Sequence, residues 1–209
     1  MMVSRSARVL FVHVQKTGGS TVDVTLPTVL PDATYVRGLR GGRHARLGPA
    51  LREHPELADY WTFGFVRNPW ARMLSWYSMI GRRSEAAESG NEVAAGKFEK
   101  NRLWRLVHED HASFESFVMQ ATDELVQLRT PQIDYLRTAT RRADFIGRTE
   151  SFDDDFRTVL EHLGAPLPER IEHRNAGPRS DYREHYTDEM RERIATLFAA
   201  DVDEFGYEF

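Results

Sequence analysis

Six consecutive residues, Lys-Thr-Gly-Gly-Ser-Thr at 16–21, bring a cation, two glycines and three hydroxyl groups together. They follow an apolar run over 8–14, rich in β-branched and aromatic residues, which predicts a buried strand. Glycine lets backbone N–H groups approach a ligand, and Ser20 and Thr21 can cap a helix that begins near Gly19. A helix N-terminus beside a lysine suits a phosphate, although a plain strand-to-helix turn has the same residues.

The order of this segment separates it from two common phosphate loops. Its lysine precedes the glycines, unlike Walker A, and it lacks the G-x-G-x-x-G dinucleotide pattern. The His-x-x-Lys-Thr-Gly-Gly run, His13 to Gly19, resembles the 5′-phosphosulfate loop of sulfotransferases that use 3′-phosphoadenosine 5′-phosphosulfate (PAPS), in the carbohydrate or Golgi-type branch, sulfotransferase family 2, and its bacterial members. The resemblance implies that the donor is bound by Lys16, Thr17, Gly18, Gly19, Ser20 and Thr21. Lys16 would also stabilise the leaving phosphate as a catalytic residue.

A second candidate phosphate site follows the predicted strand 61–66. Arg67 leaves the end of that strand, and Ser75 lies about two turns into the helix expected after it. The run from Phe63 to Trp70 resembles the 3′-phosphate motif of the same family, so the resemblance implies that Arg67 and Ser75 bind the nucleotide. A surface salt bridge for Arg67 and a hydroxyl bonded to its own helix for Ser75 are the alternatives.

Softer similarity to the family continues to the end of the chain, so the resemblance covers the chain from Val9 onward. It is carried by the segments 131–136, 144–150, 173–175, 186–188 and 205–207. In this family a C-terminal cation often holds the 3′-phosphate, which makes Arg174 and Arg179 candidates. A solvated surface arginine is the alternative for each of them.

Transfer to a neutral hydroxyl needs a base, and histidine is the usual choice near neutral pH. The resemblance implies a base between the two phosphate motifs, and His44 is the histidine in that interval. A solvent-exposed loop histidine is the alternative. His13 is expected to pack in the core. Three arginines of the His44 loop should lower its pKa and keep it neutral: Arg40, Arg43 and Arg46.

Composition limits the class of protein. The chain has 209 residues, 41% hydrophobic and 29% charged, which fits one domain over 1–209. A net charge of −4 argues against a general nucleic-acid partner, and no apolar run reaches membrane-spanning length. There is no cysteine, no tight metal-ligand spacing and no signal-like N-terminus, so we expect no metal and a cytoplasmic setting. The oligomeric state cannot be read from the sequence.

Alternating strands and helices predict an α/β fold: a single domain with a mainly parallel central sheet flanked by helices. The resemblance implies the P-loop-NTPase-like sulfotransferase fold. Pro27 and Pro31 should end the first helix early, whereas Asn68 and Pro69 should cap and start a later one. The polar stretch 84–100 is expected to be a mobile loop, either an acceptor lid or disordered. Further strands are predicted at 33–36 and 143–147, and helices at 49–53, 114–129, 152–163 and from 188 onward.

The resulting hypothesis is a PAPS-dependent sulfotransferase of the EC 2.8.2 type. It would act by in-line displacement on a hydroxyl of a carbohydrate or small-molecule acceptor, with His44 as base and Lys16 on the leaving phosphate. Two alternatives stay open. One is a nucleotide-dependent phosphotransferase (kinase) with a similar phosphate grip, and the other is a non-catalytic module that binds a phosphorylated ligand.

Overall fold

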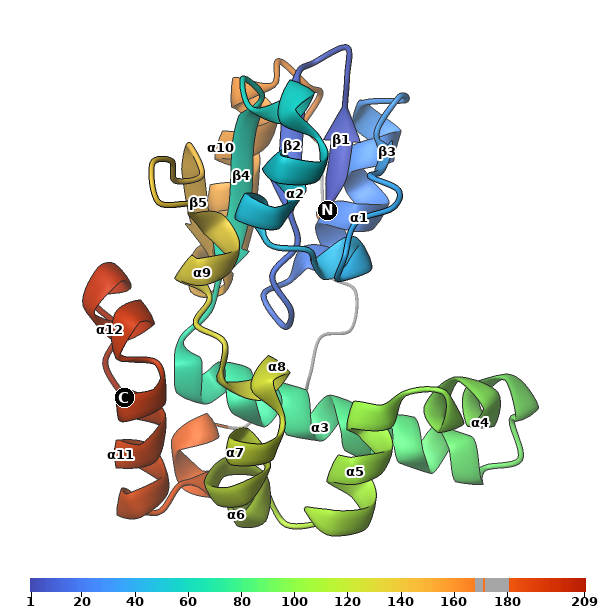
Figure 1. Ribbon diagram of the computed structural model, residues 1–209, viewed down its shortest axis with the longest axis vertical. Coiled ribbons are helices and arrows are strands. Elements are labelled where there is room, and N and C mark those ends of the chain that lie inside the picture. Colours follow the sequence, from blue (N-terminus) through green and yellow to red (C-terminus); the bar gives the residue numbers. More distant parts are fainter. Residues whose placement is uncertain (168–170, 172–180) are drawn as a thin grey trace. The chain divides into compact units, whose positions relative to one another are not determined.

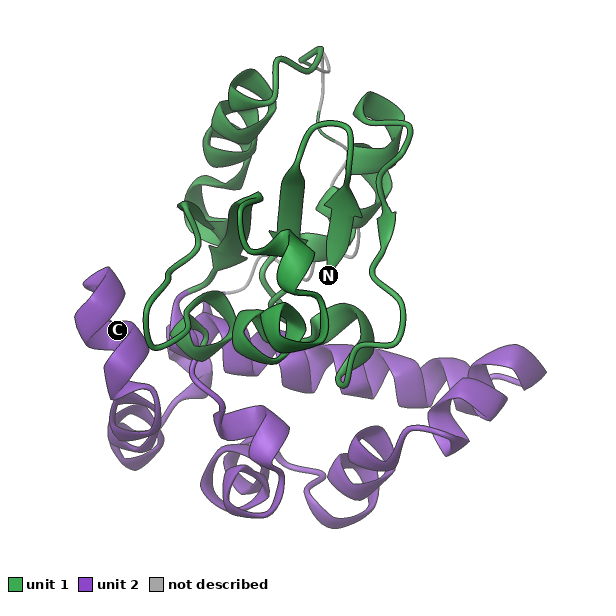
Figure 2. Cartoon of the chain, turned by 45° about the horizontal axis from the view of Figure 1, so that its top comes forward, with its two compact units in different colours: residues 1–67, 132–176 green, residues 68–131, 177–209 purple. Residues whose placement is uncertain are grey.

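The computed structural model of the chain describes residues 1–167, 171 and 181–209 (Figure 1). The chain divides into two compact units (Figure 2). Unit 1 comprises residues Met1–Arg67 and Gln132–Ala176, and unit 2 comprises Asn68–Pro131 and Gly177–Phe209. Unit 1 holds the sheet, whereas the regular structure described in unit 2 is helical. Two compact units can belong to one domain, so the expectation of a single domain stays a prediction.

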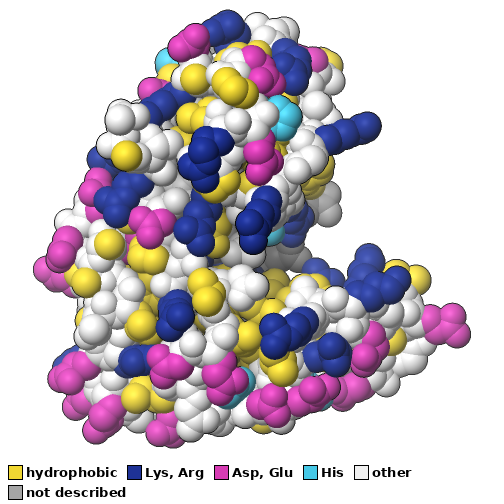
Figure 3. Space-filling view, in the orientation of Figure 1, with side chains coloured by type: hydrophobic (Ala, Val, Ile, Leu, Met, Phe, Trp, Pro, Cys, Tyr) yellow, Lys and Arg dark blue, Asp and Glu magenta, His cyan; other side chains and the backbone are white. Residues whose placement is uncertain are grey.

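Charges of both signs are interspersed over the surface. On the face drawn in Figure 3, Lys and Arg side chains alternate with Asp and Glu side chains, in keeping with the small net charge of −4. Among the described residues, no helix is long and apolar enough to cross a membrane.

The sheet of unit 1 has five strands in the order β3-β1-β2-β4-β5. Their bounds are β1 Met2–Ser4, β2 Val9–Val12, β3 Thr34–Tyr35, β4 Trp61–Val66 and β5 Phe145–Arg148. The pairs β2–β4 and β4–β5 are parallel, with Val12 opposite Gly64 and Val66 opposite Arg148. The pairs β1–β2 and β1–β3 are antiparallel.

The sheet is therefore mixed, and the expectation of a mainly parallel sheet is not confirmed. The sequence analysis did not predict β1, whose three residues are too few to show a period. Only residues 5–8 link β1 to β2, and so short a link permits an antiparallel pair but no parallel crossover. The α/β class itself is confirmed, and the two strands that precede the candidate site segments, β2 and β4, are parallel to each other.

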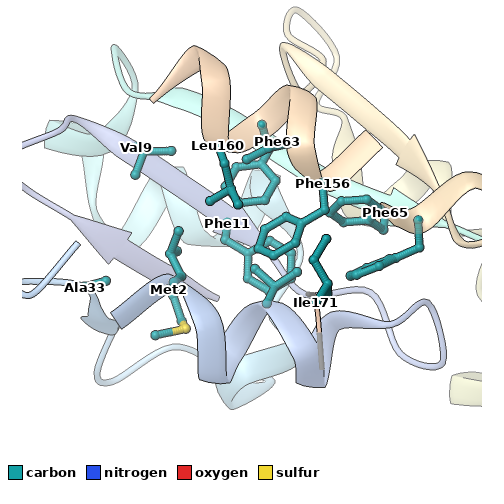
Figure 4. Close-up of a cluster of buried hydrophobic side chains, with 13 residues drawn as sticks. Met2, Val9, Phe11, Ala33, Phe63, Phe65, Phe156, Leu160 and Ile171 are labelled. Atoms are coloured by element: carbon teal, nitrogen blue, oxygen red, sulfur yellow. The ribbon is translucent and has the colours of Figure 1, made fainter. Parts of the chain in front are cut away.

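One face of the sheet carries an aromatic core (Figure 4). Helices α1 (Gly19–Val29) and α10 (Phe152–His162) cover it with Val22, Leu26, Phe152, Phe156, Val159 and Leu160. The rings of Phe11 and Phe63 stack at 5.0 Å on neighbouring strands, and Phe65 meets Phe152 at 4.7 Å. Burial of each phenylalanine side chain stabilises the folded state by about 1.5–3 kcal/mol. This core fixes the ends of β2 and β4, from which both candidate phosphate segments leave.

Helices α2 (Leu47–Glu53) and α9 (Ile133–Leu136) cover the opposite face (Figure 1). The predicted helices on both faces are thus confirmed. Gly64 of β4 admits this packing, because a Cβ there would lie 2.4 Å from Leu136 Cδ2. Three short 3₁₀ turns complete the described regular structure of unit 1: η1 Gly42–His44, η2 Pro55–Leu57 and η4 Thr149–Ser151.

Unit 2 is built on α3 (Pro69–Glu88), which starts as the sequence predicted. Asn68 caps it, with its side-chain oxygen accepting from the N–H groups of Trp70 and Ala71 at 3.1 and 3.3 Å, and Pro69 is its first residue. The other described elements of unit 2 are α4 Glu92–Glu99, α5 Arg102–Asp110, α6 Phe114–Ser116, the π-helical turn η3 Phe117–Ala121, α7 Thr122–Glu124, α8 Val126–Arg129, the 3₁₀ turn η5 Tyr182–His185, α11 Asp188–Leu197 and α12 Ala199–Phe205.

Three predicted elements differ from the structure. Residues 84–100 are largely helical, since α3 continues to Glu88 and the side chain of Asn91 caps α4. The helix predicted over 114–129 contains a π-helical turn and breaks at Leu125, whose φ and ψ are −111° and 94°. Pro27 does not end α1, which continues to Val29. Whether residues 84–100 act as a lid stays a prediction.

Candidate active site

The loop after β2 takes its shape from two residues in the left-handed region. Gly18 has a φ of 80° and is the N-cap of α1, and Lys16 has a φ of 71°. A Cβ at Gly18 would lie 2.7 Å from Phe152 Cε2, so only glycine fits between the loop and the aromatic core. A lysine with positive φ is uncommon, and such backbone strain clusters at functional sites. The loop geometry therefore supports a binding role.

The prediction that Ser20 and Thr21 cap α1 is wrong. Gly18 makes the turn earlier, so both residues fall inside the first helical turn and no side chain caps the helix. Thr21 is buried, and its N–H donates to the Gly18 carbonyl at 2.8 Å. The Thr17 hydroxyl is also buried and donates to the Val14 carbonyl at 2.9 Å. The absence of a side-chain cap leaves the N-terminus of α1 suited to an anion.

His13, expected to pack in the core, is only 3% exposed, which confirms that prediction. Its Nδ1 lies 3.0 Å from Oδ2 of Asp23, a carboxylate of α1 whose side chain is 6% exposed. A Cβ at Gly19 would lie 2.3 Å from His13 Cδ2. The imidazole therefore packs directly against the first residue of α1 and supports the loop from behind.

His44, the predicted base, closes the turn η1 and is half-buried. Its Nδ1 lies 3.0 Å from the backbone carbonyl of His13, and its Nε2 lies 3.0 Å from the Arg43 Nε–H. A carbonyl only accepts and an Nε–H only donates, so both contacts require the neutral tautomer with hydrogen on Nδ1. The two imidazoles meet edge to face at 4.5 Å. Unit 1 thus brings the predicted base to the residue that opens the phosphate loop.

Burial controls the protonation of these groups. Burial first, and then the charges of His13 and Arg43, lower the pKa of His44 to about 3. The predicted effect of the arginines is therefore confirmed for Arg43, as a smaller cause than burial. Burial also lowers the pKa of His13, while Asp23 opposes that shift. Burial acts to raise the pKa of Asp23, but contacts with His13 outweigh it, and that pKa falls.

The segment after β4 is held by a buried amide side chain. The Arg67 N–H donates to Gln132 Oε1 at 2.9 Å, and Gln132 Nε2 donates to the Arg67 carbonyl at 2.8 Å. Gln132 is fully buried. The Thr149 hydroxyl donates to the neighbouring Val66 carbonyl at 2.9 Å. These three bonds fix the backbone from which the half-buried Arg67 side chain starts.

The two segments leave the same edge of the sheet. The strands β2 and β4 are adjacent and parallel, so the loop after Val12 and the segment after Val66 both start at the carboxyl ends of their strands. Ligands of α/β sheets bind beyond this edge. The sequence prediction that Lys16 and Arg67 both follow strand ends at one edge is confirmed.

The remaining predicted nucleotide contacts are Ser75, Arg174 and Arg179. Ser75 lies in the second turn of α3, in unit 2, and is half-buried. Arg174 and Arg179 lie outside the described residues.

Sequence reasoning missed Asp23, and it placed Gln132 only within the family-like segment 131–136, without a role. Asp23 and Gln132 each act through contacts with residues far away in the chain or on another element. An acidic residue inside the predicted first helix and a glutamine after Thr130-Pro131 carry no motif of their own. Only the folded arrangement brings Asp23 to His13 and Gln132 to Arg67.

No group of three or more metal-ligating side chains occurs in the part of the chain that the structure describes.

Comparison with known proteins gives one family. A family model described as the sulfotransferase family matches residues 1–208, nearly the whole chain. No curated protein and no solved structure shows significant similarity to the chain. The match includes both candidate phosphate segments and the His44 turn. The chain therefore belongs to the sulfotransferase family, which supports sulfotransfer as the general class of its activity.

Proposed function

We propose that this protein transfers a sulfuryl group from PAPS to a hydroxyl group of a carbohydrate or small-molecule acceptor. One observation carries the proposal: the candidate base His44 is hydrogen-bonded to His13, the residue that opens the candidate phosphate loop. A donor site and a proton acceptor at one sheet edge are what sulfuryl transfer to a neutral hydroxyl requires. A cytoplasmic setting and the absence of a nucleic-acid partner stay predictions from the sequence.

The residues of the loop fit the donor. Gly18 and Gly19 let the loop pack closely on Phe152 and His13, and α1 begins without a side-chain cap. When bound, PAPS supplies the sulfuryl group, and the bond between sulfur and the bridging phosphate oxygen breaks with its electrons passing to the phosphate. The 5′ side would be held by Lys16, Thr17, Gly18, Gly19, Ser20 and Thr21, and the 3′-phosphate by Arg67, Ser75, Arg174 and Arg179.

Lys16 and α1 would stabilise the charge that develops on the leaving side. A lysine is cationic at neutral pH, and the N-terminus of a helix carries about half a positive charge. Both are fixed before the reaction, so little reorganisation opposes it. The Arg67 fork suits a phosphate because it offers two parallel N–H donors.

His44 would take the proton of the acceptor hydroxyl at Nε2, while the acceptor oxygen becomes sulfated. Its Nδ1–H is already held by the His13 carbonyl, so the ring is oriented and in the right tautomer. A pKa of about 3 keeps it neutral at pH 7 but makes it a weak base.

Ligand-dependent thermal unfolding tests the proposal. A ligand at 100 times its dissociation constant stabilises a protein by about 2.7 kcal/mol, which raises the melting temperature by several degrees. We expect a rise with adenosine 3′,5′-bisphosphate and none with ATP and Mg²⁺ at the same concentration. A rise with ATP and Mg²⁺ alone would favour the phosphotransferase instead.

The binding-module alternative needs a second measurement. We expect His44→Ala to reduce transfer from PAPS by about 10²–10⁴-fold, the range of general base catalysis, while bisphosphate still stabilises the protein. The matched control is His54→Ala, which removes a histidine that pairs with Glu56 away from the loop. Equal turnover in His44→Ala and the wild type would remove His44 from the mechanism. Binding without any turnover in the wild type would favour the module.

A further inference from the structure

The atom of His44 that should receive a proton is already occupied. Arg43 donates its Nε–H to His44 Nε2 at 3.0 Å, and Nδ1 is engaged by the His13 carbonyl. We propose that Arg43 is a latch on His44: it covers the Nε2 lone pair in the free protein, and the base accepts a proton only after the guanidinium has turned away. The catalytic meaning of the latch rests on the proposed sulfotransferase function, whereas the contact does not.

The latch has an anchor at its other end. Arg43 Nη1 lies 3.7 Å from Asp23 Oδ2, the same oxygen that His13 Nδ1 approaches at 3.0 Å. The Asp23 side chain is almost fully buried, so its attraction for the guanidinium is little screened by solvent. The hydroxyl of Tyr35 also interacts with Asp23 and with Arg43. Asp23 therefore favours the latched position and links it to the imidazole behind the loop.

Arg43 can leave this position without opening a gap in the core. Its side chain is 52% exposed, unlike that of Asp23. The turn that carries it contains Gly41 and Gly42, with φ values of 98° and 58°, and a Cβ at Gly42 would meet nothing within 4 Å. A guanidinium that is half in solvent exchanges its hydrogen bond to His44 for one with water, so its release costs little.

The latch should weaken the base in two ways. It blocks the lone pair, and its charge disfavours protonation of the ring. The other charged or titratable groups around His44 are His13 at the end of β2, Asp23 on α1 and Tyr35 on β3. The Met1 amino group donates to the Arg43 carbonyl and also belongs to this set. These groups stay in place when Arg43 alone is replaced, so a change in His44 titration reports the latch.

Arg43→Met removes the donor and the charge but keeps the length of the side chain. Arg37→Met is the matched control, because it removes the charge of an exposed arginine from the same segment. We would follow the ring nitrogens of His44 by ¹⁵N NMR across a pH titration, without ligand. In Arg43→Met we expect the His44 midpoint to rise by about one pH unit or more, with the control unchanged. An unchanged midpoint in Arg43→Met would overturn the proposal.

Steady-state kinetics then separates a latch from a group that assists the reaction. With the lone pair uncovered, we expect kcat to rise about twofold to tenfold in Arg43→Met, the equivalent of one ordinary hydrogen bond, with KM for PAPS unchanged. A fall in kcat would contradict the latch. Arg43→Gln serves as a second variant if Arg43→Met melts well below the wild type. If the wild type shows no transfer, the proposed function fails, and the NMR titration still decides whether the contact exists.

Discussion

The two candidate phosphate segments leave neighbouring parallel strands, yet they are held in opposite ways. The loop after β2 is shaped from within, by left-handed backbone at Lys16 and Gly18 and by the absence of a Cβ where Phe152 and His13 pack. The segment after β4 is held from outside, by the buried amide of Gln132 on the Arg67 backbone. The first arrangement leaves the N-terminus of α1 without a side-chain cap, whereas the second fixes the origin of a long cationic side chain.

This difference suits the two ends of a nucleotide. A phosphosulfate surrounded by backbone donors needs a close approach, which side chains would prevent. A phosphate gripped by an arginine fork needs a reach of several ångströms from a backbone that does not move. The comparison therefore predicts that replacing a glycine damages the loop after β2. It also predicts that loss of the Gln132 side chain damages the segment after β4.

A large effect on stability should follow from removing the clamp, the Gln132 amide side chain that bonds the Arg67 backbone. Gln132→Met keeps the volume but leaves the Arg67 N–H and carbonyl without their partners. Each buried polar group left unpaired costs about 1–3 kcal/mol, so we expect a loss of about 2–4 kcal/mol in urea unfolding. The control is Gln127→Met on an exposed position of α8, with little change expected. If both variants unfold at the same urea concentration, Gln132 does not hold the segment.

Gly18→Ala tests the loop shaped from within, and Gly38→Ala is its matched control. Both glycines have a φ of 80°, but a Cβ at Gly38 would meet nothing within 4 Å. The backbone strain of about 1–2 kcal/mol should be common to the two variants. Only Gly18→Ala adds overlap with Phe152, which should cost about 1–3 kcal/mol more and weaken stabilisation by the bisphosphate. Equal unfolding free energies would show that the ring yields and the loop does not depend on it.

The same contrast explains what the sequence could predict. Glycines, a lysine and an Asn-Pro cap are local signals, so the strand end at Val66 and the starts of α1 and α3 follow from neighbouring residues. The strand β2 ends at Val12, two residues before its predicted end. The family resemblance, which the match over residues 1–208 confirms, rests on those motifs. Contacts between residues distant in the chain leave no local signal in the sequence. Gln132 reaches Arg67 across 65 positions, and Arg43 reaches Asp23 only because their elements pack together.

The errors have the same origin. The expected caps Ser20 and Thr21 fit the composition of the loop, but Gly18 is the N-cap, two residues before Ser20. The stretch 84–100 was too polar to show an apolar helical stripe, although it contains Asn91, which caps α4. The first strand, β1, gains its register from pairing with β2 over Val9 to Phe11 and with β3 over Thr34–Tyr35. In each case a tertiary neighbour or a single backbone conformation decided the outcome.

The smallest effect should come from Asp32, a second side-chain clamp, which holds the turn before β2. Asp32 accepts from the Ser4 hydroxyl at 2.6 Å and from the Arg5 and Ser6 N–H groups at 2.9 Å, which hold the turn between β1 and β2. These bonds, led by the one from Ser4, lower the pKa of Asp32 to about 2. The ionised form is therefore the one that the fold prefers. Its contribution is complete above the ordinary value of 3.8 and is lost as pH falls toward 2.

Solvent screening limits that contribution, because the Asp32 carboxylate is exposed; we expect under about 1 kcal/mol. Urea unfolding of the wild type and Asp32→Asn at several pH values between 7 and 2.5 measures it. The stability difference should be constant down to about pH 5 and shrink below pH 4. Asp203→Asn, on an exposed position of α12, controls for loss of a charge. A difference that persists at pH 2.5 would mean that the turn is held by shape, as the loop after β2 is, and not by the carboxylate.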